Sequence, residues 1–296
     1  MVNPVSGGGS SQKAAERARA RLEARGDAVW WVDTVPEESA AKQAAEAAVG
    51  GADLIVVIGG DGTVAEVAAG LMGGSRRIPL AVVPRGTANV LALNLGIPRD
   101  IDGAISTVLD GTAVPIDAGS LNGQKYLVAA GTGSHAEMVA AANRRLKSKW
   151  GVLAYPLGWL RKSRGSLESV SYTVTIDGET RQIEATMIQV MNCGAVFWRG
   201  WKFAPGISPV DGLLDVVVYR ATTLADYLTA GTYLLRGAPT ETDLVEHWRG
   251  KRIQIEADPD VRLQRDGEVA GTSPATIEIE PRAVPIVMPR SGPWAG

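Results

Sequence analysis

The sequence predicts an α/β domain followed by a domain of mainly antiparallel β-structure. Up to about residue 116, short apolar runs alternate with segments of helical length, which is typical of βαβ units and of a three-layer αβα domain with a parallel sheet. Beyond that point, alternating strands and tight turns dominate. A chain of 296 residues is long enough for about two domains. We expect domains of residues 1–117 and 118–296, with room for the last residues to pack back on the first.

The elements of the first domain follow from local composition. Residues 54–58 and 80–83 are continuous apolar runs, typical of strands buried on both faces of a parallel sheet. The run AVWWV at 28–32 predicts one more strand. Helices are expected at residues 12–25, 37–49, 63–71, 88–95 and 101–109.

The second domain is predicted from alternation and turn residues. Asn122-Gly123 and Asp177-Gly178 each stand between strand-like runs and predict hairpins. Strands are expected at residues 169–176, 184–190, 213–219, 252–257, 261–264, 276–279 and 285–288, and helices at 135–146, 152–161 and 224–235.

Composition excludes several classes of protein. Lys and Arg number 30 against 32 Asp and Glu, a net charge of -2, which argues against a nucleic-acid-binding protein. A single cysteine, Cys193, excludes a disulfide framework and a thiolate metal cluster, and two histidines argue against a His-rich zinc site. No apolar run is long enough for a transmembrane helix, and no signal peptide is recognisable. We expect a cytoplasmic protein.

Three glycine-bearing segments stand where ligands bind in open α/β sheets. They are residues 3–9 (NPVSGGG), 59–63 (GGDGT) and 84–89 (PRGTAN), and the last two directly follow predicted strands. Such loops share the carboxyl edge of a parallel sheet. Glycine lets several backbone amides converge on one phosphate, and a helix beginning at Thr63 adds its positive end. The alternative is that each loop is only a tight turn.

The nucleotide-binding motifs with simple signatures do not occur. The chain has no P-loop pattern, and a G-x-G-x-x-A match at residues 131–136 lacks the acidic residue expected about 20 positions later. Asp61 would repel a phosphate, so its presence in the second loop favours Mg²⁺ between the two.

The segments NPVSGGG, GGDGTVAEVAAGL and PRGTANVLALNLGIP, in this order and spacing, resemble the diacylglycerol kinase catalytic-domain family. That family includes bacterial lipid kinases, sphingosine kinases and ceramide kinases. The later segments DGLLDV at 211–216 and DGE at 266–268 fit as well, so the resemblance covers nearly the whole chain. It implies an NAD kinase/phosphofructokinase-like first domain and a β-sandwich second domain.

The resemblance also implies a set of site residues. Contacts with ATP are implied for Thr34, Gly59, Gly60, Asp61, Gly62, Thr63, Gly86, Thr87 and Asn89. A bound Mg²⁺ is implied at Asp211, with the backbone carbonyls of Leu213 and Ser208. Glu268 matches the general base, and Asp61 would act in catalysis through Mg²⁺.

This chain departs from the family at several positions. Ala65 stands where many members have Asn, and Val90 where many have Asp, so a metal–water network would be smaller here. The basic residue after the first loop is missing, and Lys13 is the nearest candidate. The chain starts almost at the first loop, so we expect the true start upstream.

Residue types alone do not select the base or the metal ligand. Asp177-Gly178-Glu179 and Asp266-Gly267-Glu268 both read as hairpin turns, and only the resemblance selects Glu268. Asp211-Gly212 can likewise be a turn before a strand, in which Asp215 would face solvent.

These observations predict an ATP- and Mg²⁺-dependent lipid kinase that phosphorylates a hydroxyl of diacylglycerol or a related lipid. The alternatives are an NAD kinase and a catalytically idle nucleotide- or lipid-binding protein. Aromatic residues with basic neighbours at 147–162 and 197–203 are candidates for transient contact with a membrane surface, although either can be packed helix or core. Open sheet edges would allow a homodimer.

Overall fold

The computed structural model describes residues 1–4, 10–35, 38–74, 76–132, 168–195, 204, 206–223, 225–226, 229 and 243–294. The chain divides into two compact units. The first unit comprises Met1–Ile116 and Arg282–Gly296, and the second comprises Asp117–Pro281. Residues 282–296, which follow the second unit in sequence, thus belong to the first.

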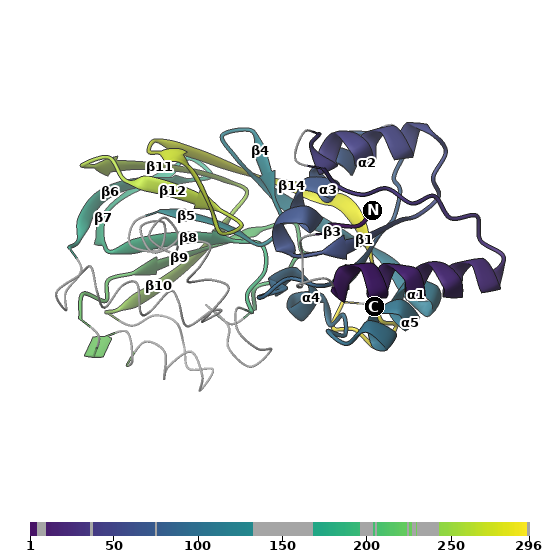
Figure 1. The fold of residues 1–296 in the computed structure, drawn as a ribbon. Helices are drawn as coiled ribbons and strands as arrows, with labels where there is room; N and C mark the ends of the chain where they lie inside the picture. Colours follow the sequence, from purple (N-terminus) through teal and green to yellow (C-terminus); the bar gives the residue numbers. More distant parts are fainter. Residues whose placement is uncertain are drawn as a thin grey trace. The chain divides into compact units, whose positions relative to one another are not determined.

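The first unit is a parallel sheet between two layers of helices. Strand β1 (Ile55–Gly59) pairs in parallel with β2 (Leu80–Pro84), and β2 pairs in parallel with the end of β14 (Ala275–Met288). Helices α2 (Ala40–Val49) and α3 (Asp61–Leu71) lie on one side of this sheet, and α1 (Ser10–Arg25) and α5 (Ile101–Asp110) on the other (Figure 1). The predicted αβα architecture is confirmed.

Burial explains why these segments form these elements. All five residues of β2 are buried, because helices cover both faces of the strand. Helix α1 is highly charged, yet three alanines on one face, Ala14, Ala15 and Ala18, are buried against α5 and the strands. Small side chains on this face let the helix approach the sheet closely.

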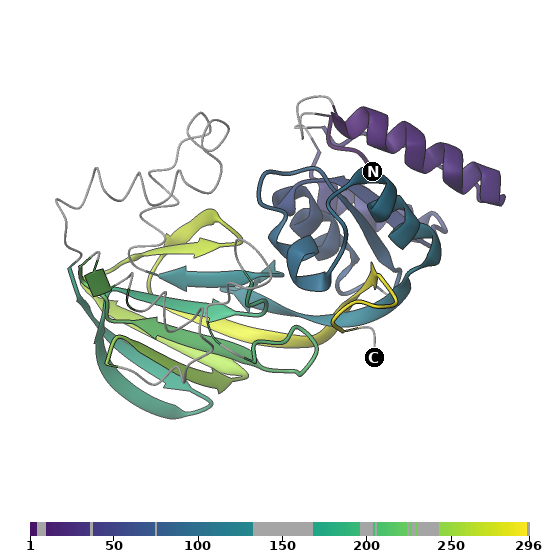
Figure 2. The ribbon, with the colours of Figure 1, turned by 90° about the horizontal axis from the view of Figure 1, so that it is seen from below.

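The second unit is a β-sandwich of antiparallel strands (Figure 1, Figure 2). One sheet runs from the first half of β14 through β11 (Arg252–Asp258) and β6 (Val170–Ile176) to β7 (Glu179–Ala185). The end of β3 (Thr112–Leu121) and β4 (Gln124–Tyr126) join it. The other sheet has the order β10, β9, β8, β5, β12, β13, with bounds Val245–Gly250, Leu214–Tyr219, Met187–Met191, Ala129–Thr132, Arg262–Arg265 and Glu268–Thr272.

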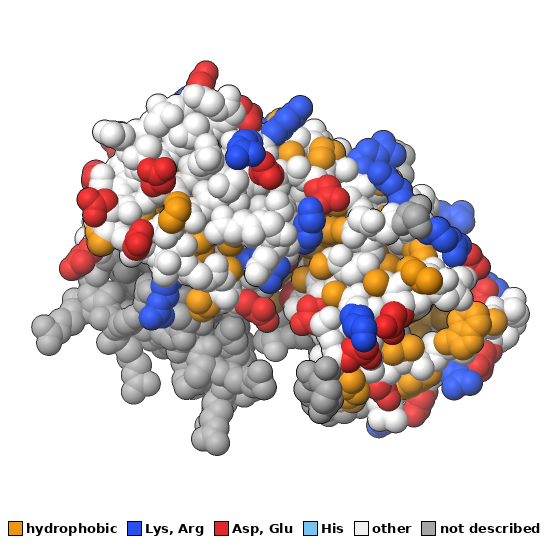
Figure 3. Space-filling model, turned by 90° about the horizontal axis from the view of Figure 1, so that it is seen from above, with side chains coloured by type: hydrophobic (Ala, Val, Ile, Leu, Met, Phe, Trp, Pro, Cys, Tyr) orange, Lys and Arg blue, Asp and Glu red, His pale blue; other side chains and the backbone are white. Residues whose placement is uncertain are grey.

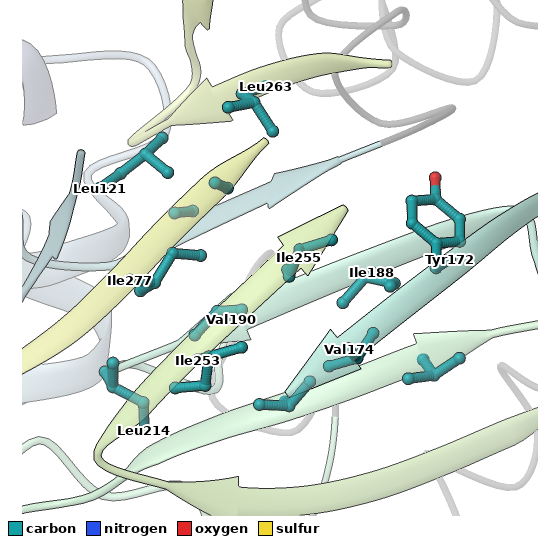
Figure 4. Packing of buried hydrophobic residues seen from close by; sticks show 14 of the residues in the cluster. Leu121, Tyr172, Val174, Ile188, Val190, Leu214, Ile253, Ile255, Leu263 and Ile277 are labelled. Atoms are coloured by element: carbon teal, nitrogen blue, oxygen red, sulfur yellow. The ribbon is translucent and has the colours of Figure 1, made fainter. Parts of the chain in front are cut away.

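The core of the sandwich takes alternate residues from both sheets. Val174 and Ile253 come from one sheet, and Ile188, Val190 and Leu214 from the other, and all five are fully buried. Figure 4 shows these side chains pointing toward one another between the layers. This packing confirms the predicted antiparallel sandwich.

Three hairpin turns have the backbone that their sequences predict. Asn122-Gly123, Asp177-Gly178 and Asp266-Gly267 each adopt positive φ at both residues, from 45° to 95°. Positive φ at both central residues defines the type I′ turn, which Asn-Gly and Asp-Gly favour.

Several predicted strands differ from the structure for identifiable reasons. Residues 28–32 form no strand, and next to them Val2 makes only an isolated bridge, to Asp33. The strand predicted at 184–190 is two strands, β7 and β8, and the chain changes sheets at Thr186. The two strands predicted near the C-terminus are the single strand β14, which continues through Arg282 at φ 54°.

Other differences concern the ends and the existence of elements. Helix α3 begins at Asp61, two residues before the predicted start, and α2 begins at Ala40 after the N-cap Ser39. Helix α4 (Val90–Leu95) begins two residues later than predicted. Strands β10 and β13 have no counterpart among the predicted strands. The helices predicted at 135–146 and 152–161 lie outside the described residues, as does most of the one at 224–235.

Candidate functional site

The GGDGT loop connects β1 to the beginning of α3. Strand β1 ends at Gly59, Gly60 is the N-cap, and no side chain caps the first turn of the helix. The first amides of an α-helix have no partner within it, and they carry its positive end. The loop thus offers backbone donors suited to a phosphate, as the sequence predicted.

The second and third glycine loops are in direct backbone contact. A Cβ added at Gly86 would lie 2.6 Å from the Cα of Gly60, so neither loop leaves room for a side chain there. The amide of Arg85 donates to the carbonyl of Gly59 at 2.7 Å. The two loops therefore form one continuous backbone surface at the carboxyl edge of β1 and β2.

Asp61 joins the same two loops through its carboxylate. Its Oδ1 accepts from the amide of Leu91 at 3.2 Å, at the start of α4, and the amides of Asn89 and Val90 also bond to it. Burial raises the pKa of Asp61, and these backbone donors oppose that effect. The carboxylate thus fixes the beginning of α4 against the beginning of α3.

The remaining residues predicted to contact ATP lie around these loops. Asn89 is 5% exposed, and its side chain both accepts from the amide of Gly86 and donates to its carbonyl, each at 2.8 Å, so it closes the PRGTAN loop. Thr87 is exposed at the tip of that loop. Thr63 Oγ1 accepts from Asn3 Nδ2 at 2.8 Å, and the amide of Thr34 donates to the carbonyl of Val2 at 2.8 Å. The first unit thus brings Asn3, Thr34 and the GGDGT and PRGTAN loops to one edge of the sheet.

The three residues predicted to bind Mg²⁺ lie in the segment before β9. Asp211 Oδ1 accepts from the amide of Leu213 at 3.1 Å, and Ser208 Oγ accepts from the amide of Val210 at 3.4 Å. The other oxygen of Asp211 forms an ion pair with Arg249. Within the described ranges, no group of three or more His, Cys, Asp or Glu side chains has the arrangement of a metal site. As they stand, these residues do not fit a bare cation, because a guanidinium already occupies the Asp211 carboxylate.

Arg249, which is exposed, also forms a polar cluster with His247 and the fully buried Asp215. Arg249 Nε lies 3.2 Å from Asp215 Oδ1, and His247 Nε2 lies 2.7 Å from the same oxygen. Asp215 is 0% exposed, so the expectation that it faces solvent is wrong. Its neighbours Leu214 and Val216 fill the sandwich core, and Asp215 points to the other face of the sheet, where His247 and Arg249 of β10 lie.

Two buried polar residues that sequence reasoning missed support the DGLLDV segment. Asp117 is 1% exposed, its Oδ2 accepts from the amide of Gly212 at 2.7 Å, and its own amide donates to the carbonyl of Pro209 at 2.7 Å. Asn192 is fully buried and donates from Nδ2 to the carbonyls of Asp117 and Leu127, each at 2.8 Å. Neither residue lies in a recognisable short motif, so no local signal in the sequence identifies them.

Glu268 is the first residue of β13, directly after the Asp266-Gly267 turn, and it is exposed. It pairs across the hairpin with Arg265. An exposed carboxylate on a fixed turn can accept a proton from a hydroxyl brought to it, provided that the turn holds its direction.

The surface offers little further evidence of partners. Side chains of both charges are intermixed on the face drawn in Figure 3. No helix in the described part of the chain is long and apolar enough to cross a bilayer. The aromatic segments at 147–162 and 197–203, which were predicted to contact a membrane, lie outside the described residues.

Comparisons with known proteins agree with the two units. Residues 1–121 match the diacylglycerol kinase catalytic domain, and residues 127–288 match the YegS C-terminal NAD kinase beta sandwich-like domain. A diacylglycerol kinase of Bacillus subtilis is 33% identical over 292 residues, which are 98% of this chain and 95% of that protein. An uncharacterized Synechocystis protein is 37% identical over 84% of this chain, but the match spans only 58% of that longer protein.

A solved structure has the same fold over nearly the whole chain. The crystal structure of a diacylglycerol kinase candidate from Bacillus anthracis superimposes with a TM-score of 0.81 at 27% identity, and covers 97% of this chain and 95% of its own. These findings confirm the family that the glycine loops and the two Asp-Gly segments indicated. The chain belongs to the diacylglycerol kinase catalytic-domain family.

Proposed function

We propose that this protein transfers the γ-phosphate of ATP, supplied as its Mg²⁺ complex, to a hydroxyl of diacylglycerol or a related lipid. One observation carries the proposal: the GGDGT and PRGTAN loops are in backbone contact beside the first turn of α3, which no side chain caps. The chain also belongs to this kinase family. The Mg²⁺ of the nucleotide would neutralise phosphate charge.

The chain's own residues supply positioning and proton transfer. Backbone amides of the GGDGT and PRGTAN loops would hold the phosphates. Asp61 would keep the two loops together, because its carboxylate accepts from the amide of Leu91. The acceptor oxygen forms a bond to the γ-phosphorus while the bond to the β-bridging oxygen breaks. The hydroxyl proton passes to the carboxylate of Glu268, and ADP leaves with the electron pair of the broken bond.

An acceptor panel tests this function. Release of ADP from MgATP is measured with diacylglycerol in detergent micelles, with NAD, and with no acceptor. We expect turnover with the lipid only. Turnover of NAD would establish the NAD kinase alternative, and a protein that binds ATP but turns over no acceptor would be an idle one, consistent with Ala65 and Val90 in place of polar residues.

Asp61→Ala tests the loop assembly in the first unit. We expect loss of phosphoryl transfer, and also a loss of stability of about 1–3 kcal/mol, because the amides at the start of α4 lose a buried acceptor. Circular dichroism would separate the two effects by showing that the fold survives. Full activity in this variant would remove Asp61 from the site.

The lipid acceptor determines where in the cell the proposed reaction takes place. Diacylglycerol resides in membranes, so we propose a cytoplasmic protein that contacts the membrane surface transiently. Co-sedimentation with vesicles that contain diacylglycerol, with and without MgATP, would test this. We also propose that any homodimer forms by pairing of sheet edges, which analytical ultracentrifugation would test.

A further inference from the structure

The turn that carries Glu268 is connected to a pair of buried amide side chains. Gln264, on β12, accepts through Oε1 from the amide of Gly267 at 3.1 Å. Its Nε2 donates to Oε1 of Gln189 on β8 at 3.0 Å. Gln189 in turn donates to the carbonyl of Ile188 at 3.2 Å. A continuous chain of hydrogen bonds therefore runs from the middle of the sheet to the residue before Glu268.

The arrangement requires a glycine on the strand between the two glutamines. Gly131 of β5 pairs with Gln189 on one side and with Gln264 on the other. A Cβ at Gly131 would lie 2.1 Å from Nε2 of Gln189, so this side chain lies directly over the glycine to reach Gln264. Both glutamines are only 1% exposed. Buried amides give little net stability compared with apolar side chains of the same shape, which favours a role beyond packing.

A second attachment holds the same turn from its other side. The carboxylate of Asp266 accepts from the amides of Leu127 and Val128 at 2.9 Å and of Ala129 at 3.1 Å. The amide of Asp266 returns a bond to the carbonyl of Ala129 at 2.9 Å. With Asp266 fixed by this segment and Gly267 fixed by Gln264, the backbone that leads into Glu268 has two independent anchors.

We propose that Gln264, held in place by Gln189 over Gly131, is a positioning residue that fixes the direction of Glu268 for proton transfer. The inference rests on the proposed function, because it requires Glu268 to be the base. A misplacement of about 1 Å costs on the order of 100-fold in a positioned reaction. Loss of the anchor should therefore lower kcat and leave the binding of MgATP, made by the first unit, unchanged.

The test compares Gln264→Met with the double variant Gln189→Met/Gln264→Met. The single variant leaves Gln189 buried without its partner, whereas the double variant replaces both amides by apolar side chains of similar volume. We expect the double variant to be less destabilised to urea than the single variant, because only the amide of Gly267 loses its acceptor and no glutamine is left buried without its partner. We expect its kcat to be lowered about 10- to 100-fold and its KM for MgATP to be unchanged. If the double variant does not fold, the kcat of Gln264→Met, normalised to the concentration of sites that bind nucleotide, tests the proposal instead.

Thr175→Val is the matched control, because Thr175 stands two residues before Asp177 as Gln264 stands two before Asp266. Its hydroxyl lies 2.9 Å from that of Thr180, across the other hairpin. This control should keep kcat. Wild-type kcat in a folded glutamine variant, while Glu268→Gln is inactive, would overturn the inference and leave the proposed function standing. Full activity in Glu268→Gln would instead overturn the base assignment itself, and the inference with it.

Discussion

Two turns in the second unit have the same sequence, Asp-Gly-Glu, and nearly the same local structure. Asp177 and Gly178 have φ of 49° and 95°, and Asp266 and Gly267 have φ of 45° and 82°. Each aspartate accepts backbone amides of another segment: Asp177 those of Lys251 and Arg252, and Asp266 those of residues 127–129. The same three-residue sequence therefore adopts the same turn conformation at both places.

The difference lies in what surrounds each turn. Two residues before the aspartate, one turn has Thr175, which reaches Thr180 across its own hairpin, and the other has Gln264, which reaches Gln189 two strands away. Glu179 has a side chain 81% exposed and lies 3.5 Å from Arg181. The comparison teaches that a short motif specifies a turn, whereas the neighbouring strands decide which distant side chains support that turn.

The largest expected effect separates the two glutamates. Glu268→Gln should lower kcat by about 10²–10⁴-fold, because the amide cannot accept the hydroxyl proton. Glu179→Gln, the matched control, should keep wild-type kcat. Steady-state ADP release measures both. Equal losses in the two variants would show that the turns do not differ in function.

Replacing each turn aspartate by asparagine compares how strongly the two turns are held by backbone amides of other segments. In Asp266→Asn, the amide group that replaces Oδ2 can no longer accept from Leu127, so we expect a loss of about 1–3 kcal/mol in urea unfolding and a lower kcat. In Asp177→Asn the remaining oxygen can still accept from both Lys251 and Arg252, so the loss should be smaller. A larger loss at Asp177 would contradict this account of the anchors.

Alanine at each turn glycine tests backbone strain in isolation. An added Cβ would meet no atom within 4 Å at Gly178 or at Gly267, so only the positive φ matters. Gly267→Ala and Gly178→Ala should each cost about 1–2 kcal/mol in the free energy of unfolding. Only Gly267→Ala should also lower kcat. If Gly178→Ala lowered kcat equally, global stability rather than the direction of Glu268 would explain the effect.

The smallest effect concerns a tyrosine beside one turn only. Burial, and secondly the charge of Asp266, raise the pKa of Tyr126 well above its ordinary 10.0. Its neutral form is favoured in the folded state, so its contribution to stability is complete below pH 10 and is lost as the pH rises from there. Tyr126→Phe should therefore show a smaller fall in stability between pH 10 and 11, although Tyr172, also with a raised pKa, keeps part of the slope. An unchanged slope would mean that Tyr126 ionises freely.

The elements that depend on local sequence were predictable. The apolar runs predict β1 and β2, and the Asn-Gly and Asp-Gly pairs predict the three hairpin turns. The GGDGT and PRGTAN loops also lie together at one sheet edge, because strands in parallel order bring them there.

What depends on distant partners was not predictable. Strand β10 has the mixed sequence VEHWRG and exists because β9 pairs with it. Alternation along the strand predicts that Asp215 faces solvent, but His247 and Arg249 on β10 contact its carboxylate, and Asp215 is fully buried. Likewise nothing near Gln264 in sequence identifies Gln189 or Gly131 as its neighbours, because three separate strands bring them together.

Strand β14 has a consequence for the order in which the chain can fold during synthesis. Its last residues, Ile286 and Val287, pair with Leu80 and Ala81 at the centre of the first unit, although some 165 residues of the second unit are made in between. A ribosome adds about 5–20 residues each second, so the first unit waits on the order of ten seconds or more for its final strand. During that interval the exposed edge of β2 is open to pairing with other chains. The first unit is thus synthesised first, but its sheet is completed only after the whole second unit has been synthesised.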